Sequence, residues 1–312
     1  MKKKILTTAL VLVALLSVSC ADRQSGPAVP ETPADKSDFP TEVKAANGTI
    51  KIEGRPSKIV SLSATATEML FAIDAGEQVV AVDSTSSFPA EAPKTDLSAF
   101  TPNLEAIAGY EPDLVVVSDD IQDLLAGLER LDIPALHLPA AKNLGDTYTQ
   151  IEALGDATGH RDDAAELTSN MKEEITALAA RVPEPEKPLT YYHELDNTLY
   201  SVTSATFAGE VYGLAGLRNI ADAVPDQAGG YPQLSNEFVI DANPDLIFLA
   251  DTKCCAQSLE TVKQRPGWSG IDAVEAGRVV PLDDDVASRW GPRVVELLRA
   301  VVDAVEPALQ AA

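Results

Sequence analysis

Residues Asp162 to Arg181 read DDAAELTSNMKEEITALAAR, which is the longest unbroken helical pattern in the chain. One apolar stripe recurs at spacings of three to four and holds Ala165, Leu167, Met171, Ile175 and Leu178. Acidic residues fill the first turn, and Pro183 and Pro185 stop the pattern. Twenty residues at about 1.5 Å each predict a rod about 30 Å long. We therefore predict a linking helix over residues 160–182 that joins two lobes, with a ligand in the crevice between them.

Short apolar segments alternate with helical patterns on both sides of this helix. Strands are predicted at residues 49–53, 58–62, 78–83, 113–118 and 135–138 in the first half, and at 189–195, 246–250 and 278–282 in the second. Strands separated by helices imply parallel pairing with right-handed crossovers. The predicted fold class is α/β, with two Rossmann-like lobes of parallel sheet joined by one long α-helix. The N-terminal lobe spans residues 48–159 and the C-terminal lobe residues 183–312.

An internal repeat relates the two halves. Residues 105–119 read EAIAGYEPDLVVVSD and residues 237–251 read EFVIDANPDLIFLAD, with every pair of positions offset by 132. Each copy predicts a short helix, a Pro-Asp turn and a buried strand. Glu105 and Glu237 occupy matching places near the helix starts. Such residues often only complement the helix dipole, but two at matching places also suit docking onto a symmetric cationic partner.

The first residues are typical of an exported protein. Lys2, Lys3 and Lys4 precede an apolar run and then Cys20, so residues 1–19 are predicted to be a signal peptide and Cys20 a lipidation site. Residues 20–47 form the predicted lipidated tether. Removal of the signal leaves 21 basic against 48 acidic residues, a formal charge of −27. This charge argues against nucleic acid as a partner.

The remaining chemistry-bearing residues are few. Cys254 and Cys255 are adjacent, so they either close a strained vicinal disulfide or stay free thiols. Of the histidines, only His137 and His193 are predicted to be able to face each other across the crevice. No metal motif such as HExxH or CxxC is present, and no metal site is predicted. The chain also lacks GxSxG, P-loop and GxGxxG motifs, so an enzyme is not expected.

The order and spacing of several motifs resemble one known family. They are SKIVSLSATATEMLFAIDAGEQVVAVDSTSSFPAEAPK, FTPNLEAIAGYEPDLVVVSD, LGDATGHRDDAAEL, YPQLSNEFVIDANPDLIFLAD, RPGW and VVPLDDDVASRWGPRVVELL. Residues 48–308 thereby resemble the substrate-binding proteins of ABC importers for ferric siderophores, haem and vitamin B12. The resemblance implies two α/β lobes joined by one long helix. It also implies that Glu105 and Glu237 pair with arginines of a permease dimer, which works with its ATPase.

The resemblance further implies a set of ligand-binding residues. Phe100 and Tyr231 stand where the cobalamin-binding branch has tryptophans, and Asp285 and Arg289 match its Asp/Arg pair. Trp290, beside Arg289, completes the predicted set. Flat aromatics suit a broad, partly apolar ligand, so the expected cargo is cobalamin or another corrinoid, or a ferric siderophore. Ligation of haem by His193, Tyr191, Tyr192 or Tyr200 is the alternative.

The predicted protein is therefore a monomeric, extracytoplasmic lipoprotein held at the cell membrane by its lipid anchor. It captures a small molecule and contains no resident cofactor. A haem or metal receptor, a sensor, or an enzyme on the same fold are the competing hypotheses.

Overall fold

The computed structural model describes residues 39–183, 186–225 and 228–311, with residues 37–312 forming one compact unit. The predicted signal peptide, Cys20 and most of the predicted tether lie outside the described residues. The tether prediction extended too far, because β1 (Thr41–Ala45) pairs antiparallel with β2 (Gly48–Ile52). Val43 and Ile52 are buried on one face of this hairpin. Of the residues in β1, only Val43 is buried, which leaves a weak sequence signal.

The first lobe is built on a four-stranded parallel sheet. Its strands are β3 (Ile59–Leu62), β4 (Val79–Val82), β5 (Leu114–Val117) and β6 (Ala135–His137), in the order β4-β3-β5-β6. The helices of this lobe are α1 (Ala64–Ala72), α2 (Leu104–Ala108), α3 (Leu124–Glu129) and α4 (Leu144–Thr158). All four residues of β3 and of β5 are buried, as expected for strands covered on both faces.

The second lobe repeats this plan. Its strands are β7 (Thr190–Glu194), β8 (Arg218–Asn219), β9 (Leu246–Leu249) and β10 (Val279–Pro281), in the order β10-β9-β7-β8. Its helices are α6 (Phe207–Leu214), α7 (Asn236–Ala242), α8 (Leu259–Lys263), α9 (Asp272–Glu275), α10 (Asp284–Ser288) and α11 (Val294–Ala311). In each sheet, the strand that comes first in the sequence lies between the second and the third, and the strand that comes fourth forms an edge. The prediction of two parallel α/β lobes is confirmed, and the repeated segments form equivalent helices and strands.

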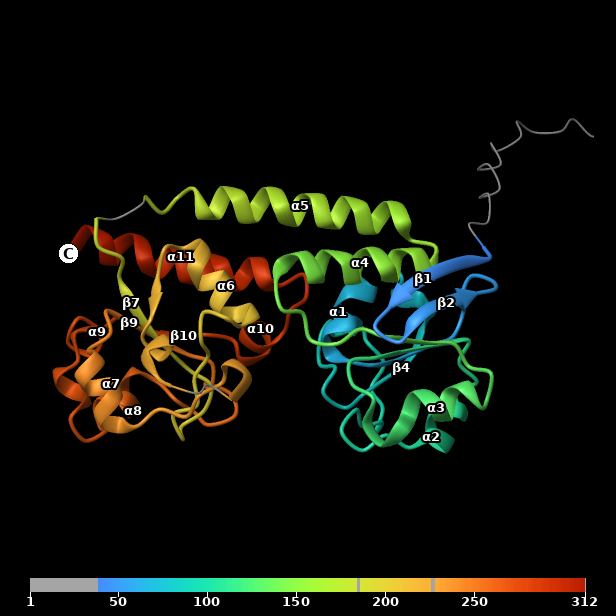
Figure 1. Cartoon of the computed structure of the whole chain (residues 1–312), viewed down its shortest axis with the longest axis horizontal. Helices are drawn as coiled ribbons and strands as arrows, with labels where there is room; N and C mark the ends of the chain where they lie inside the picture. Colours follow the sequence, from blue (N-terminus) through green and yellow to red (C-terminus); the bar gives the residue numbers. More distant parts are fainter. Residues whose placement is uncertain (1–38, 184–185, 226–227, 312) are drawn as a thin grey trace, which may run out of the picture. The chain divides into compact units, whose positions relative to one another are not determined.

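Helix α5 (Arg161–Ala179) is the predicted linking helix, and it extends along both lobes in Figure 1. Its buried side chains are Ala164, Thr168, Met171, Ile175 and Leu178. The predicted stripe was wrong at its start, since Ala165 is exposed and Ala164 faces inward. The cause is a close approach of α4, where a Cβ on Gly155 would lie 2.5 Å from the Cβ of Ala164.

The two lobes share one hydrophobic cluster around α5. It includes Leu70 of α1, Ile151 of α4, Met171 of α5 and Leu298 of α11. Helix α5 contacts both α4 and α11. Arg181, just after α5, forms ion pairs with two residues of α11, Asp303 at 2.8 Å and Glu306 at 2.7 Å. The lobes are therefore held by a common core as well as by the linking helix.

Candidate functional site

The carboxyl ends of parallel strands are the usual ligand edge of an open α/β sheet. In this chain the loop after β4 in the first lobe meets the segment after β10 in the second. The Ser87 hydroxyl donates to the Asp285 carboxylate at 3.4 Å, and the Arg289 guanidinium donates to the Thr85 carbonyl at 2.9 Å. Asp285 and Arg289, both predicted to bind the ligand, are themselves paired at 2.9 Å. The candidate site lies where these loops of the two lobes come together.

Exposed aromatic side chains lie on this edge in both lobes. Phe100 is 70% exposed and Tyr231 47% exposed, so both predicted residues are available to a ligand. Phe88 and Tyr200 are also exposed, at 43% and 40%. Phe88 was not predicted, and Tyr200 was considered only as a possible haem ligand. Tyr200 forms a β-bridge with Gln233, which places it on the strand partner of the Tyr231 segment. Four exposed aromatic side chains that follow the carboxyl ends of the strands make this edge a candidate binding surface.

Arg289 has a second role that the sequence did not reveal. Its guanidinium also donates to the Glu68 carboxylate at 2.6 Å, and Arg293 reaches the same carboxylate at 2.6 and 2.9 Å. Glu68 lies on α1 of the first lobe and is only 2% exposed. The side chains of Arg289 and Arg293 are 10% and 14% exposed. Glu68 therefore neutralises charge on both arginines and ties the lobes together.

Glu68 could have been found from the sequence. It is the single charged residue in the otherwise uncharged α1 segment ATATEMLFA. A carboxylate placed inside such a buried helix requires a cationic partner, because an unpaired buried charge is very costly. The GPR sequence that contains Arg293 lies 225 positions away, so the partner could not be identified from spacing alone.

Trp290 also contacts the opposite lobe. Its indole nitrogen donates to Gln150 at 3.0 Å, and its carbonyl accepts from the Thr147 hydroxyl at 2.9 Å, both on α4. The ring is partly buried against the shared core. These contacts make Trp290 a residue of the lobe junction, and its assignment to the ligand surface stays a prediction.

Glu105 and Glu237 have matching surroundings. Each is the second residue of its helix, α2 or α7. Asn103 caps α2 by accepting from the Ala106 amide at 3.0 Å, and Ser235 caps α7 in the same way at 3.1 Å. Both carboxylates are exposed, and neither forms an ion pair with any residue that the structure describes.

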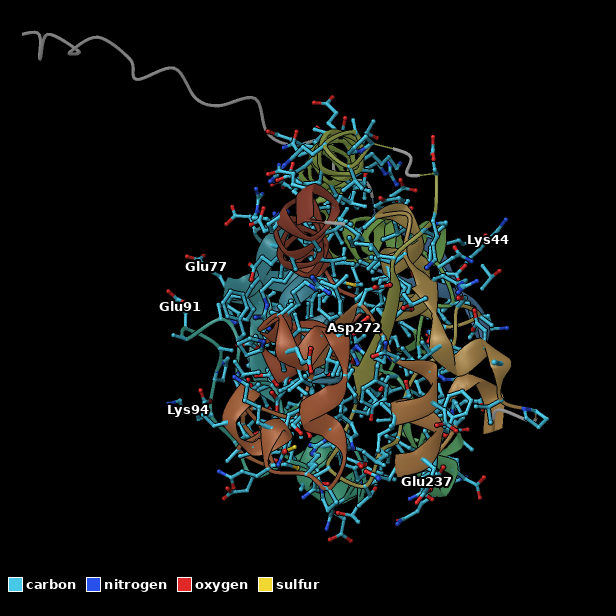
Figure 2. All side chains as sticks on the ribbon, turned by 90° about the vertical axis from the view of Figure 1, so that its left-hand side faces the viewer. Lys44, Glu77, Glu91, Lys94, Glu237 and Asp272 are labelled. Atoms are coloured by element: carbon cyan, nitrogen blue, oxygen red, sulfur yellow. The ribbon has the colours of Figure 1, made fainter. Side chains whose placement is uncertain are left out.

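These two helices lie on the side of their lobes away from α5 (Figure 1). Figure 2 shows Glu237 projecting from that end of the molecule. An exposed aromatic precedes each carboxylate, with Phe100 five and Tyr231 six positions upstream. The arrangement places one acidic residue and one aromatic residue on each lobe.

The histidines have local partners. His193 was considered able to face the crevice, but it is fully buried, with Nδ1 2.7 Å from the Tyr212 hydroxyl of α6. Burial lowers the pKa of His193 to about 4, so the ring stays neutral. His137 Nε2 lies 3.2 Å from the Ser118 carbonyl, and His160 pairs with Asp163. His137 and His193 therefore do not face each other across a crevice.

Two of the tyrosines considered as haem ligands are inaccessible. Tyr191 and Tyr192 are fully buried, and burial raises the pKa of both phenols well above the usual value. Tyr200 alone of the three is exposed. Over residues 39–183, 186–225 and 228–311, no group of three or more His, Cys, Asp or Glu side chains is arranged to hold a metal ion. Cys254 and Cys255 are free thiols.

A buried carboxyl group, Asp251, follows β9 in the second lobe. It is 0% exposed, and both of its oxygens lack a hydrogen-bond partner among the described residues. Nearby Glu194 is also buried and forms a bidentate pair with Arg265 at 2.5 and 2.6 Å. Burial raises the pKa of Asp251 to about 7, and the negative charge of Glu194 adds to the shift.

We expect Asp251→Asn to stabilise the protein at pH 8 by about 1–3 kcal/mol, since it removes an unpaired buried charge. The folded pKa is about 7 and the ordinary value 3.8, so folded protein retains a proton that unfolded protein loses. The unfolding free energy should therefore fall as pH rises from about 4 to 7, and the variant should lose this slope. Urea denaturation between pH 4 and 8 measures both effects. Asp119→Asn, at the exposed equivalent position of the repeat, is the control; a slope unchanged by Asp251→Asn would contradict this assignment.

None of the helices within the described ranges is both long and apolar enough to cross a bilayer.

Comparison with known proteins agrees with this geometry. The sequence model of the family described as Periplasmic binding protein matches residues 59–286. The uncharacterized ABC transporter substrate-binding lipoprotein YvrC of Bacillus subtilis is 28% identical, over 98% of both chains. A cobalamin-binding protein of Halobacterium salinarum is 28% identical over 95% of this chain and 83% of its own length.

The fold is also found among solved structures. One is a possible iron-binding, periplasmic solute-binding protein of Staphylococcus epidermidis, with a TM-score of 0.70 and 25% identity. The alignment covers 81% of this chain and 99% of that protein. The family, relatives and structure named above are all described as binding proteins of solutes or substrates.

Proposed function

The chain belongs to the periplasmic binding protein family and is the substrate-binding protein of an ABC importer, and from this premise we propose that its ligand is a corrinoid of the cobalamin type. The observation that carries the proposal is the set of four exposed aromatics, two on each lobe, at the carboxyl ends of the sheets: Phe88, Phe100, Tyr200 and Tyr231. Such rings bury a large flat ligand with little loss of side-chain entropy. The cobalamin-binding relative from Halobacterium salinarum supports the same ligand class.

The charges at the lobe junction favour a ligand without strong negative charge. A ferric catecholate requires several unpaired cations in its pocket. Arg289 and Arg293, the cations nearest the predicted site, already share the Glu68 carboxylate. Lys253, in the loop after β9, is likewise paired with Asp283 and Asp285. A neutral or cationic ferric chelate is the second candidate, supported by the similarity to the possible iron-binding protein.

The proposed mechanism is capture and delivery rather than catalysis. Glu105 and Glu237 present one carboxylate per lobe to two arginine clusters of the permease dimer, which the ATPase drives. We further propose that Cys20 carries the lipid anchor, that the protein acts outside the cytoplasm, and that it works as a monomer. The similarity to a substrate-binding lipoprotein supports the anchor. An enzyme or sensor on this fold is the competing function, and turnover of the ligand would identify the enzyme.

A titration panel tests the ligand. Cyanocobalamin, haemin, a neutral ferric siderophore and a ferric catecholate are each added to the purified protein, and the melting temperature is followed. A tight ligand stabilises the folded state by mass action, so cyanocobalamin should raise the melting temperature in proportion to the logarithm of its concentration. A shift with haemin or the catecholate alone would overturn the corrinoid proposal.

Tyr231→Ala should weaken cyanocobalamin binding by about 10-fold or more, because a stacked aromatic contributes about 1–3 kcal/mol of burial and contact energy. Phe100→Ala should have a similar effect from the other lobe. Calorimetric titration gives the dissociation constants. Tyr110→Ala is the control, since Tyr110 is an aromatic of the first lobe that is also exposed but lies after α2. Unchanged affinity in both test variants would show that the ligand binds elsewhere.

A further inference from the structure

A seven-residue loop from Asp251 to Gln257 follows β9 and carries two adjacent thiols. Cys254 is exposed and Cys255 is half-buried, and both are free. The neighbouring Cys255 thiol raises the pKa of Cys254 to about 12, with partial desolvation adding to the effect, which indicates that the two thiols interact. The loop lies at the carboxyl edge of the second sheet, beside α10.

The carboxylate of Asp284 holds this loop in place. It accepts the backbone amides of Thr252 and Cys254, each at 2.9 Å, and the amide of Lys253 at 3.0 and 3.1 Å. Gln257 adds a hydrogen bond from its amide nitrogen to the Cys255 carbonyl at 2.9 Å. The peptide groups on either side of the cysteine pair are therefore held in place by the side chains of Asp284 and Gln257.

The same loop is connected to the junction between the lobes. The Lys253 ammonium pairs with Asp285 at 3.0 Å, and Asp285 pairs with Arg289 at 2.9 Å. Arg289 in turn reaches Glu68 of the first lobe and the Thr85 carbonyl. A continuous path of ion pairs therefore runs from the residue beside Cys254 to α1.

A disulfide between adjacent cysteines is strained. Neighbouring Cα atoms lie about 3.8 Å apart across a trans peptide, whereas disulfides usually join Cα atoms about 4.4–6.8 Å apart. Strained and exposed disulfides form and break near the ambient redox poise instead of staying permanently oxidised. Such a bond would also require the peptide group between the cysteines to rotate, away from the orientation in which the Cys255 amide donates to the Asp251 carbonyl at 3.2 Å.

We propose that Cys254 and Cys255 form a reversible redox site whose oxidation loosens the junction between the lobes. The oxidant is a low-molecular-weight disulfide. One cysteine thiolate attacks it, releasing one small thiol and forming a mixed disulfide. The second cysteine, after losing its proton, attacks the protein sulfur of that mixed disulfide and releases the second small thiol. In sum the protein loses two hydrogen atoms as the vicinal disulfide forms, and the small disulfide is reduced to two thiols.

The first test is chemical. The full chain carrying Cys20→Ser, which leaves Cys254 and Cys255 as its only cysteines, is incubated with oxidised glutathione and analysed by intact mass. The expected product has lost two hydrogen atoms, carries no glutathione, and regains both thiols on reduction. The matched variant Cys255→Ser should stop at the mixed disulfide. If the protein with both Cys254 and Cys255 also stops at the mixed disulfide, or forms disulfide-linked dimers, the proposal is overturned.

The second test follows the first lobe by hydrogen exchange. In the oxidised protein, amides of residues 85–88 and of α1 should exchange several-fold faster than in the reduced protein, although the oxidised residues lie in the other lobe. Lys253→Met keeps both thiols but removes the ion pair to Asp285. This variant should form the disulfide equally well and show a smaller change in the first lobe. If oxidation of the protein that retains Lys253 leaves amide hydrogen exchange in the first lobe unchanged, the proposed effect of oxidation on the lobe junction is wrong.

Discussion

Uptake of labelled cobalamin by cells is expected to fall by about 30-fold or more when Glu105 and Glu237 are both replaced by alanine. Truncating one partner of a close interfacial charge pair commonly costs about 2–5 kcal/mol, and 2 kcal/mol corresponds to about 30-fold. The affinity of the soluble protein for cobalamin should change little, because both carboxylates lie on exposed helix starts and have no partner among the described residues. Uptake, permease co-purification and ligand affinity are measured on the same variants.

The control for this experiment removes the same charge elsewhere. Glu91→Ala with Asp272→Ala also deletes one exposed acidic residue from each lobe. Figure 2 shows both side chains on other parts of the surface than Glu237. The control should keep wild-type uptake. Normal uptake by the Glu105/Glu237 double variant would refute the docking role, while lost ligand affinity in that variant would mean that its effect is not specific to docking.

Glu68→Gln should lower the unfolding free energy by about 3–5 kcal/mol, the usual consequence of removing one partner of a buried ion pair. The amide would remove the carboxylate that Arg289 and Arg293 share, leaving Arg289 with Asp285 alone, in positions where the two arginines are only 10% and 14% exposed. Urea denaturation measures the change. Glu306→Gln removes one partner of Arg181 on the surface, where the two side chains are 38% and 33% exposed, and should have a much smaller effect because water screens exposed pairs. If Glu68→Gln lowers the unfolding free energy as little as this surface control does, the ion pairs of Glu68 with Arg289 and Arg293 do not hold the lobes together.

The sequence predicted the regular parts of the fold well, because their signal is local. Buried strands such as Leu114–Val117 and Leu246–Leu249 are continuous apolar runs bounded by Pro-Asp turns. The 132-residue repeat placed equivalent helices in both lobes. The two-residue strand β8 and the five-residue helix α10 were missed, because neither has an apolar run or a detectable period.

The site was predicted only in part, because its charges depend on contacts between distant segments. Glu105, Glu237, Phe100 and Tyr231 lie in local motifs, and all four are exposed as expected. Arg289 was predicted to bind a ligand, but the carboxylate closest to it belongs to Glu68, 221 positions away in the sequence. No local pattern specifies such a pairing; only the packing of α1 against the second lobe does.

The shared core has a consequence for biosynthesis. Helix α11 is synthesised after all the other described elements, and its side chains belong to the same cluster as those of α1, α4 and α5. The cluster that the two lobes share is therefore incomplete until α11 has been made, although each lobe also has a smaller cluster formed by its own residues. We therefore expect the interior that joins the two lobes to form late, after the segments that build each separate sheet.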